Sequence, residues 1–266
     1  MSGTQLQAQA PAPAPVAGGR AEWSPRVMPP IGADLTEQQK LACAFRILAK
    51  EGFTENIAGH ITMRDQASEH LWVNPWGLWW EEVKASDLCR VDGEGQVVEG
   101  KWDVTPAIHI HTELHRCRPD IVVAVHNHPY HVTVLAALGL LPEMVHQTGA
   151  MFDGDLAFVD EYTGEVANAE LGADLAGRIG EASVIVLANH GVIVTGPTVE
   201  EATYRAATVD RQCRLMYDVV TSGRPYTTMP PPLRGPMKAS LLERGTEYYW
   251  GGAVRALLRE QPEVLA

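Results

Sequence analysis

Three histidines follow apolar runs in two separate parts of the chain. His126 and His128 come at the end of the run 121–125, and His190 follows the run 184–188. Side chains two positions apart on a strand point to the same face, so His126 and His128 can bind one ion. We expect His190 to come from a neighbouring strand as a third ligand. Three protein ligands leave a position open for water or substrate, which is typical of a catalytic metal.

The ligand type does not identify the metal, because imidazole suits zinc, iron, copper and nickel. The alternative for each residue is a hydrogen-bonded histidine at a strand end. The chain has 10 histidines, so an isolated pair carries little weight. Three histidines in the same strand-to-loop context favour a metal site.

Composition limits the classes of partner. A chain of 29.0 kDa with 45% hydrophobic and 20% charged residues can bury one large core. Its net charge of −12 argues against binding to a phosphate backbone, so we expect no nucleic-acid partner. The cysteines show no CxxC spacing and are typical of reduced thiols in a cytoplasmic protein. They are Cys43, Cys89, Cys117 and Cys213.

Residues 1–30 have the composition of a disordered or extended tail, with an alternating Ala-Pro run. They lack the positive start and the continuous apolar stretch of a secretory signal. No segment is long enough to span a bilayer, so we expect no membrane partner. The alternative for the tail is a segment that wraps around a neighbouring subunit.

Apolar spacing and turn residues predict a mixture of helices and strands. Short runs broken by Gly, Pro, Asn and Asp over 57–98 indicate a strand meander, whereas residues 139–167 are rich in loops. Adjacent strands without regular alternation favour a largely antiparallel sheet with helices on its faces. Helices are predicted from Thr36 to before Gly52, then over 106–117, 129–138, 169–179, 198–220 and 237–258.

Five short motifs occur in a fixed order along the chain. They are 56–64 (Asn-Ile-Ala-Gly-His-Ile-Thr-Met-Arg), 74–78 (Asn-Pro-Trp-Gly-Leu), 118–120 (Arg-Pro-Asp), 126–129 (His-Asn-His-Pro) and 189–191 (Asn-His-Gly). Each motif alone is a weak signal. As an ordered set they resemble the class II aldolase/adducin family from about Leu41 to Val220.

The resemblance implies an α/β fold, a three-layer αβα domain with a central mixed, largely antiparallel sheet. It implies one divalent metal ion per subunit, zinc, iron(II) or manganese, held by His126, His128 and His190. It also implies a homo-oligomer, with a tetramer favoured and sites near subunit interfaces. We expect the metal-binding domain over 31–225. Residues 226–266 are then a proline-rich linker and a C-terminal helix packing on the same domain or a neighbouring subunit.

One departure from the family concerns acid/base chemistry. Relatives that act on sugar phosphates place a carboxylate about nineteen residues before the first metal histidine, and that position here is Ala107. His109 is the local substitute that we expect to serve as catalytic acid/base, because histidine titrates near neutral pH. For His111, the sequence favours a functional role and a structural role equally.

A second departure concerns the substrate. Trp76 replaces the serine of the family's phosphate-binding turn, with Trp72, Trp79 and Trp80 close by. We expect Trp76 and Trp79 to bind a hydrophobic or aromatic substrate on a flat apolar wall. The alternative is that some of these indoles fill the core or a subunit contact.

Four further residues are candidates for the site. His60 and Arg64 are predicted to bind substrate, because arginine can grip a carboxylate with two hydrogen bonds, although a surface strand pair is the alternative for Arg64. Tyr130 is a predicted substrate contact after the histidine pair. Tyr162 is a predicted catalytic donor to a developing oxyanion, with packing as the alternative.

Three functions fit these features. The first is a divalent-metal-dependent carbon–carbon lyase, a decarboxylase or aldolase, acting on a hydrophobic or aromatic oxo or hydroxy acid. The second is a non-haem iron(II) oxygenase of aromatic 2-oxo or 2-hydroxy acids, which would use the same three histidines. The third is an adducin-like scaffold without catalysis, which has no need of an open metal site.

Overall fold

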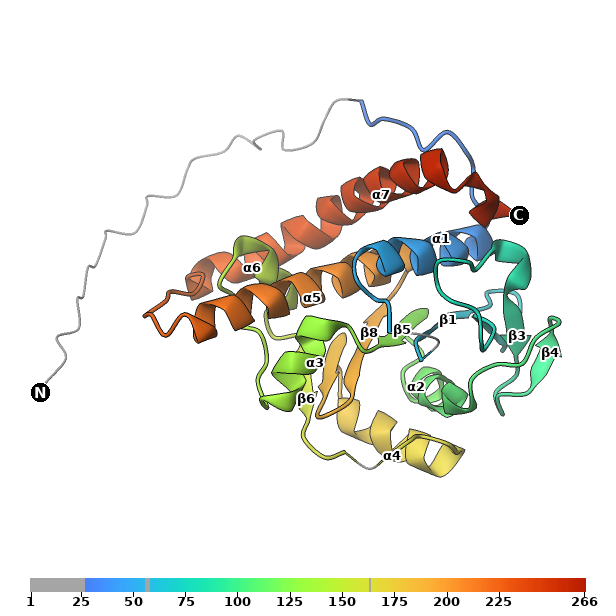
Figure 1. The fold of residues 1–266 in the computed structure, drawn as a ribbon, viewed down its shortest axis with the longest axis horizontal. Helices are drawn as coiled ribbons and strands as arrows, with labels where there is room; N and C mark the ends of the chain where they lie inside the picture. The colour runs from blue at the N-terminus through green and yellow to red at the C-terminus, as the bar shows by residue number, and fades with distance from the viewer. Residues whose placement is uncertain (1–26, 56–57, 163) are drawn as a thin grey trace, which may run out of the picture.

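One eight-stranded sheet forms the centre of the molecule (Figure 1). The computed structural model describes residues 27–55, 58–162 and 164–266. The strands are β1 His60–Arg64, β2 Leu71–Val73, β3 Cys89–Val91, β4 Val97–Glu99, β5 Val123–Asn127, β6 Leu156–Val159, β7 Val184–Leu187 and β8 Gly191–Gly196. Their order across the sheet is β4-β3-β2-β1-β5-β8-β7-β6.

The sheet is antiparallel except for the pairing of β6 with β7. At its centre, β5 pairs with β1 on one side and with β8 on the other. This register sets His126 opposite His60 and opposite Ile193. The strands at the centre are buried on both faces and rich in valine and isoleucine, as expected for a sheet covered by helices on both sides.

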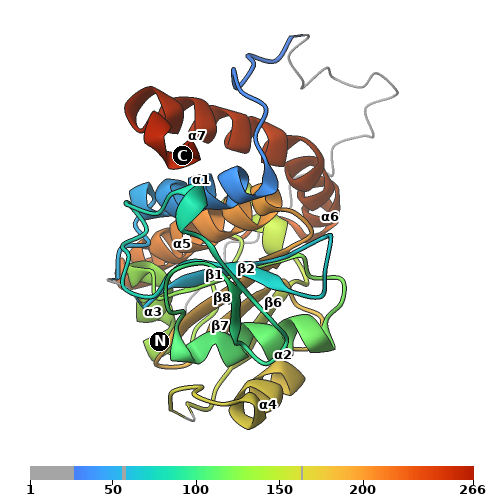
Figure 2. The same ribbon diagram turned by 90° about the vertical axis from the view of Figure 1, so that its right-hand side faces the viewer.

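Helices cover both faces of the sheet (Figure 2). On one face lie α1 Glu37–Lys50, α5 Val199–Thr221 and α7 Thr246–Glu260, and on the other lie α2 His109–Cys117 and α4 Ala169–Ile179. The short α3 Tyr130–Ala137 follows β5 and packs against α5. The predicted three-layer αβα architecture with a mixed, largely antiparallel sheet is therefore confirmed. Among the described residues, no helix combines the length and the apolar character needed to cross a membrane.

Side-chain caps fix where the main helices begin. Thr36 forms a capping box with Gln39 at the start of α1, and Thr198 accepts a hydrogen bond from the backbone of Glu201 at the start of α5. Asn168 caps α4 in the same way. Such caps satisfy backbone N–H groups that have no partner inside the helix, so these starts could be read from the sequence.

Two regions differ from the sequence-based expectation. The segment 139–167, predicted to be rich in loops, contains the strand β6 and a 3-10 helix, Gln147–Phe152. The proline run expected as a linker opens helix α6, Pro231–Ser240, which continues through a π-helical turn, Leu241–Gly245, into α7. Proline is accommodated there because the first turn of a helix has no internal N–H bonds to lose.

The described part of the N-terminal segment begins at residue 27, so most of the tail predicted over 1–30 lies outside the described residues. Asn56 and Ile57 of the first family motif lie outside them as well.

Two glycines of α4 differ in how closely α2 approaches them. A Cβ added at Gly172 would come 2.4 Å from His109 O and 2.8 Å from Glu113 Cγ, whereas a Cβ at Gly177 would meet nothing within 4 Å. We expect Gly172→Ala to lower the free energy of unfolding by about 1–3 kcal/mol through overpacking. We expect the control Gly177→Ala to raise it by up to about 1 kcal/mol through helix propensity. Urea unfolding followed by circular dichroism measures both, and equal stabilities would contradict the close α2–α4 packing.

Candidate metal centre

The three predicted histidines converge at one edge of the central strands. The ring centroids lie 5.1 Å apart for His126 and His128, 4.8 Å for His126 and His190, and 4.9 Å for His128 and His190. One ligand nitrogen from each ring can be chosen so that all three lie within 4.8 Å of one another. This spacing is suited to a single ion bound by three imidazoles.

The turn between β7 and β8 places His190. Asn189 has φ 53°, the left-handed region, which asparagine enters more readily than most residues. Gly191 follows, and a Cβ there would come 2.5 Å from both Asn127 O and His128 Cδ2. The Asn-His-Gly motif therefore has a local cause, because its flanking residues let the turn close against the end of β5.

Hydrogen bonds leave Nε2 available on two of the rings. His126 Nδ1 lies 3.0 Å from Val192 O, and a carbonyl can only accept, so Nδ1 carries the proton. His128 Nδ1 bonds to the Glu55 carboxylate, while His128 Nε2 is buried with no partner among the described residues. Metal-binding histidines commonly donate their second N–H to a carbonyl or carboxylate in this way. The orphaned Nε2 and the donor set therefore fit a divalent metal ion.

Burial keeps the imidazoles of His126 and His190 neutral. It lowers the pKa of His126 well below the usual value of 6.5, and the neighbouring histidines lower it further. It also lowers the pKa of His190 to about 4, with His128 adding to the effect. Because a metal binds the unprotonated ring, near neutral pH these groups are already in the binding form.

A cavity of about 260 Å³ opens at the three histidines. Ala107, where the family places its carboxylate, is part of the lining together with Trp76 and Glu165. An adjoining cavity of about 650 Å³ shares His128 and His190 with it and reaches Tyr162, whose ring centroid lies 6.0 Å from that of His190. The space beside the histidines is therefore bounded by an alanine, an indole and a carboxyl side chain.

His60 lies beside this cluster and lines the same cavity. Its ring centroid is 4.9 Å from that of His126, yet it falls outside the group of three that can share an ion. Its Nδ1 lies 2.6 Å from Nε2 of His111, which is fully buried on α2. The structure therefore brings a second pair of imidazoles next to the predicted metal ligands.

Two predicted site residues lie away from the cavity. The Arg64 guanidinium bonds to the backbone carbonyls of His115 and Ile121, at 2.7 and 3.4 Å, so those donors are occupied. His109 faces the β3–β4 turn, where a Cβ on Gly95 would lie 3.8 Å from its Cε1. Helix phase explains this position, because residues 109 and 111 differ by about 200° around a helix with 3.6 residues per turn.

The four tryptophans do not form one wall. Trp76 lines the cavity and is 51% exposed, whereas Trp79 is 42% exposed and is not part of that lining. Trp80 is buried, donates to Gly59 O at 3.1 Å and packs against Phe45. Trp72 packs under the Arg90 guanidinium instead. Of these four indoles, only that of Trp76 is therefore placed to contact a ligand in the cavity.

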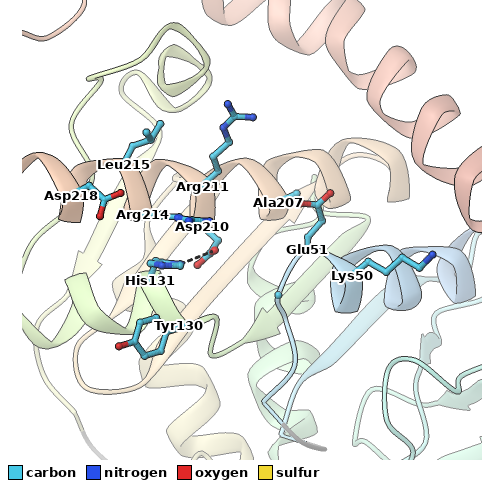
Figure 3. Close-up of a pocket in the computed structure, with 11 residues that line it drawn as sticks. Lys50, Glu51, Tyr130, His131, Ala207, Asp210, Arg211, Arg214, Leu215 and Asp218 are labelled. Atoms are coloured by element: carbon cyan, nitrogen blue, oxygen red, sulfur yellow. Dashed lines mark hydrogen bonds and ion pairs between the residues drawn. The ribbon is translucent and has the colours of Figure 1, made fainter.

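Tyr130 lies between two cavities and is 72% exposed. It lines the cavity that reaches Tyr162 and also a larger one of about 740 Å³ (Figure 3). The larger cavity has charged walls from α1, α3 and α5, and within it His131 Nδ1 lies 3.3 Å from an Asp210 carboxylate oxygen. Tyr130 therefore borders both the space beside His128 and His190 and the charged cavity.

Sequence reasoning did not find Glu55 or Glu165, and it left the role of His111 open. Both glutamates lie in irregular segments, where no periodicity marks a side chain as facing a site. The signal for His111 was present, because His111 and His115 are four residues apart and share one face of α2. Both are buried against the sheet.

Comparison with known proteins agrees with this architecture. A sequence profile described as the Class II Aldolase and Adducin N-terminal domain matches residues 39–217, more than half of the chain. The chain belongs to the class II aldolase and adducin family. The crystal structure of L-fuculose 1-phosphate aldolase from Glaciozyma antarctica PI12 is similar, with a TM-score of 0.77 and 25% identity, covering 91% of this chain and 97% of that one.

Two relatives carry names that bear on the chemistry. The decarboxylase NovR of Streptomyces niveus is 30% identical over 188 residues, 69% of this chain and 70% of that protein. The 4-hydroxy-3-prenylphenylpyruvate oxygenase/4-hydroxy-3-prenylbenzoate synthase of Streptomyces roseochromogenus subsp. oscitans is 30% identical over 190 residues, 69% of each chain. This family member is thus similar both to a decarboxylase and to an oxygenase.

Substitutions around the three histidines should separate ligands from neighbours. We expect His128→Ala to abolish binding of one zinc ion per chain, because it removes the orphaned Nε2. We expect Glu55→Gln to weaken zinc binding by about 10–100-fold through loss of the carboxylate that orients His128. His109→Ala is the control and should bind zinc as the unmodified chain does. Competition titration with element analysis measures all three, and tight binding by His128→Ala would rule out the proposed ligand set.

The buried histidines also predict how stability depends on pH. Burial lowers the pKa of His60, His111 and His126 well below 6.5, and that of His115 to about 3. As the pH falls below 6.5, the unfolded chain therefore binds protons that the folded chain does not, so acid favours unfolding. Each excess proton changes the free energy of unfolding by about 1.4 kcal/mol per pH unit.

We accordingly expect the metal-free protein, kept in chelator, to be markedly less stable to urea at pH 5 than at pH 7. A free energy of unfolding that stays level over this range would show that these rings titrate normally in the folded protein.

Proposed function

We propose that this chain is a divalent-metal-dependent carbon–carbon lyase, a decarboxylase or aldolase, that acts on a hydrophobic or aromatic oxo or hydroxy acid. The observation that carries the proposal is the cavity at the three histidines, where Ala107 and Trp76 line the wall. The position of the sugar-phosphate aldolases' carboxylate has no acid, and the position of their phosphate-binding serine has an indole.

The proposed metal ligands are His126, His128 and His190, with zinc, iron(II) or manganese as the candidate ions. A bound divalent ion supplies a Lewis acid that polarises a carbonyl and stabilises the negative charge left by bond cleavage. The chain's own residues bind and orient the substrate around that position. Tyr162 is our proposed donor to the developing oxyanion, since its ring lies 6.0 Å from that of His190.

Decarboxylation fits the lining better than aldol cleavage does. Loss of carbon dioxide needs an electron sink and a later proton, and no base has to begin the bond breaking. Aldol cleavage needs a base to remove a hydroxyl proton, and at the position where the sugar-phosphate aldolases carry their carboxylate this chain has Ala107. The similarity to a decarboxylase supports the same choice.

The substrate class follows from the walls of the cavity. An indole face gives a flat apolar surface for a ring or an alkyl chain. Trp76 therefore favours an aromatic or hydrophobic acid over a sugar phosphate, which needs a turn of glycine and small hydroxyl residues to bind its charge.

The second candidate function is a non-haem iron(II) oxygenase of aromatic 2-oxo or 2-hydroxy acids. One observation favours it, the similarity to an oxygenase of a prenylated phenylpyruvate. Three histidines leave open positions for a substrate and for dioxygen. An adducin-like scaffold without catalysis is the remaining alternative. A purified protein with no tightly bound metal would indicate it.

We also propose that the protein is a cytoplasmic homo-oligomer with the tetramer favoured, as the family resemblance implies. Cys43, Cys89 and Cys213 are buried free thiols, in keeping with a reducing compartment. The exposed Tyr130 and Trp76 would then lie near a neighbouring subunit, which would narrow the mouth of the cavity. Light scattering coupled to gel filtration measures the assembly.

Anaerobic turnover distinguishes the candidate functions. We expect the protein loaded with zinc or manganese to release carbon dioxide or an aldehyde from aromatic 2-oxo or 2-hydroxy acids without dioxygen, and to leave sugar phosphates unchanged. The His128→Ala variant is the inactive control. Turnover that requires iron(II) and consumes dioxygen would replace the lyase by the oxygenase. Less than about a tenth of an equivalent of metal after purification, without turnover, would favour the scaffold.

A further inference from the structure

A chain of buried hydrogen bonds runs from the cavity into the space between β1 and α2. It begins at His60 and passes through His111, Thr62 and His115. The successive distances are 2.6 Å from His60 Nδ1 to His111 Nε2, 2.6 Å from His111 Nδ1 to Thr62 Oγ1, and 2.9 Å from Thr62 Oγ1 to His115 Nε2. His115 Nδ1 ends the chain at 3.2 Å from Ile121 O. All four side chains are buried.

The carbonyl at the inner end fixes the direction of every hydrogen bond. Ile121 O can only accept, so His115 Nδ1 carries a proton and, in the neutral ring, Nε2 accepts from the Thr62 hydroxyl. Thr62 has then used its one hydrogen, so His111 Nδ1 must donate to Thr62 Oγ1.

The same reasoning extends to the cavity. His111 Nε2 has a free lone pair once Nδ1 carries the proton, so it accepts from His60 Nδ1. A further proton on His111 or His115 would reverse the hydrogen bonds between that ring and His60, and would leave His60 protonated at Nε2. Burial opposes this proton, because it lowers the pKa of each of the two rings. With the rings neutral, one arrangement of protons satisfies the whole chain of hydrogen bonds.

We propose that Thr62, His111 and His115 are positioning residues that hold His60 as the Nδ1-protonated tautomer, so that its Nε2 offers a lone pair to a substrate hydroxyl beside the metal-binding histidines. The inference rests on the proposed function only for the nature of that substrate. The group that meets His60 must be a donor, such as the hydroxyl of a hydroxy acid or of an enol. His60 thus supplies an acceptor in a cavity where Ala107 replaces the family's carboxylate.

Arg64 gives the inner end of the chain a second constraint. Its guanidinium donates to His115 O at 2.7 Å and to Ile121 O at 3.4 Å, which holds both ends of the loop that carries the terminal carbonyl. A positive charge at this place also opposes a second proton on His115. The charge of Arg64 therefore helps to keep the hydrogen-bonded histidines neutral. This role differs from the predicted one, in which Arg64 binds a substrate carboxylate.

The tautomer can be measured directly. Zinc-loaded protein with 13C,15N-labelled histidine is examined by solid-state NMR, which separates protonated from unprotonated ring nitrogens and Nδ1 from Nε2. The His60 signals are identified by their loss in His60→Gln. We expect Nδ1 protonated and Nε2 unprotonated. A His60 ring that is protonated at Nε2, or bound to zinc, would overturn the inference.

A matched pair of variants tests the role of the chain of hydrogen bonds. Thr62→Val keeps the shape and removes the hydroxyl, so we expect His60 to show a mixture of tautomers while the zinc content stays the same. Thr62→Ser restores the hydroxyl and should restore the single tautomer. An unchanged His60 spectrum in Thr62→Val would overturn the role of Thr62. If Thr62→Val fails to fold, the spectrum of the unmodified protein still decides the tautomer.

Turnover gives an independent measure. We expect Thr62→Val to lower kcat by about ten-fold or more with KM changed less than about two-fold, and Thr62→Ser to recover most of the loss. A change confined to KM would contradict positioning of an acceptor for the reacting group. If the unmodified protein turns over none of the acids, the proposed function fails, while the NMR result still tests this inference separately.

Discussion

The antiparallel pairing of β5 with β1 and β8 is the constraint on which the rest of the site depends. It sets His60 opposite His126 and brings the β7–β8 turn, with His190, to the end of β5. Residues far apart along the chain become neighbours through these backbone hydrogen bonds. The side chains then need only their own local bonds to reach their final orientation.

Two layers of imidazoles follow from this pairing. The outer three, His126, His128 and His190, have ring spacings suited to one ion, and two of them are oriented by Val192 O and Glu55. The inner layer leads from His60 away from the cavity to a backbone carbonyl. Burial lowers the pKa of His126 and His190 in the outer layer and of His60, His111 and His115 in the inner one, so the same desolvation that destabilises the fold in acid prepares these rings to bind a metal and a substrate.

The sequence was sufficient for features that depend on local periodicity. The alternation of side chains along a strand predicted that His126 and His128 would share a face. The capped starts of α1 and α5 were readable for the same reason. The family resemblance, and not periodicity, led from His126 back to Ala107, which lines the cavity.

Features that depend on tertiary packing were not readable from the sequence. Which face of α2 meets β1 decided between His109 and His111, and helical spacing alone does not settle that choice. The tryptophans around Trp76 lie in a turn-rich segment, so their proximity in sequence did not make them neighbours in space. The strand β6 is short and only its last residue, Val159, is buried, so its apolar signal was weak.

The turn at Asn189 makes the three histidines unequal in their tolerance of mutation. The strand that carries His126 is held by partners along both edges, so its path depends little on any single side chain. The position of His190 depends on one residue in the left-handed region and on one glycine in close contact with β5. Most single replacements at either position would move the third histidine without touching it. Loss of metal binding in a descendant of this chain would therefore begin most easily at the turn.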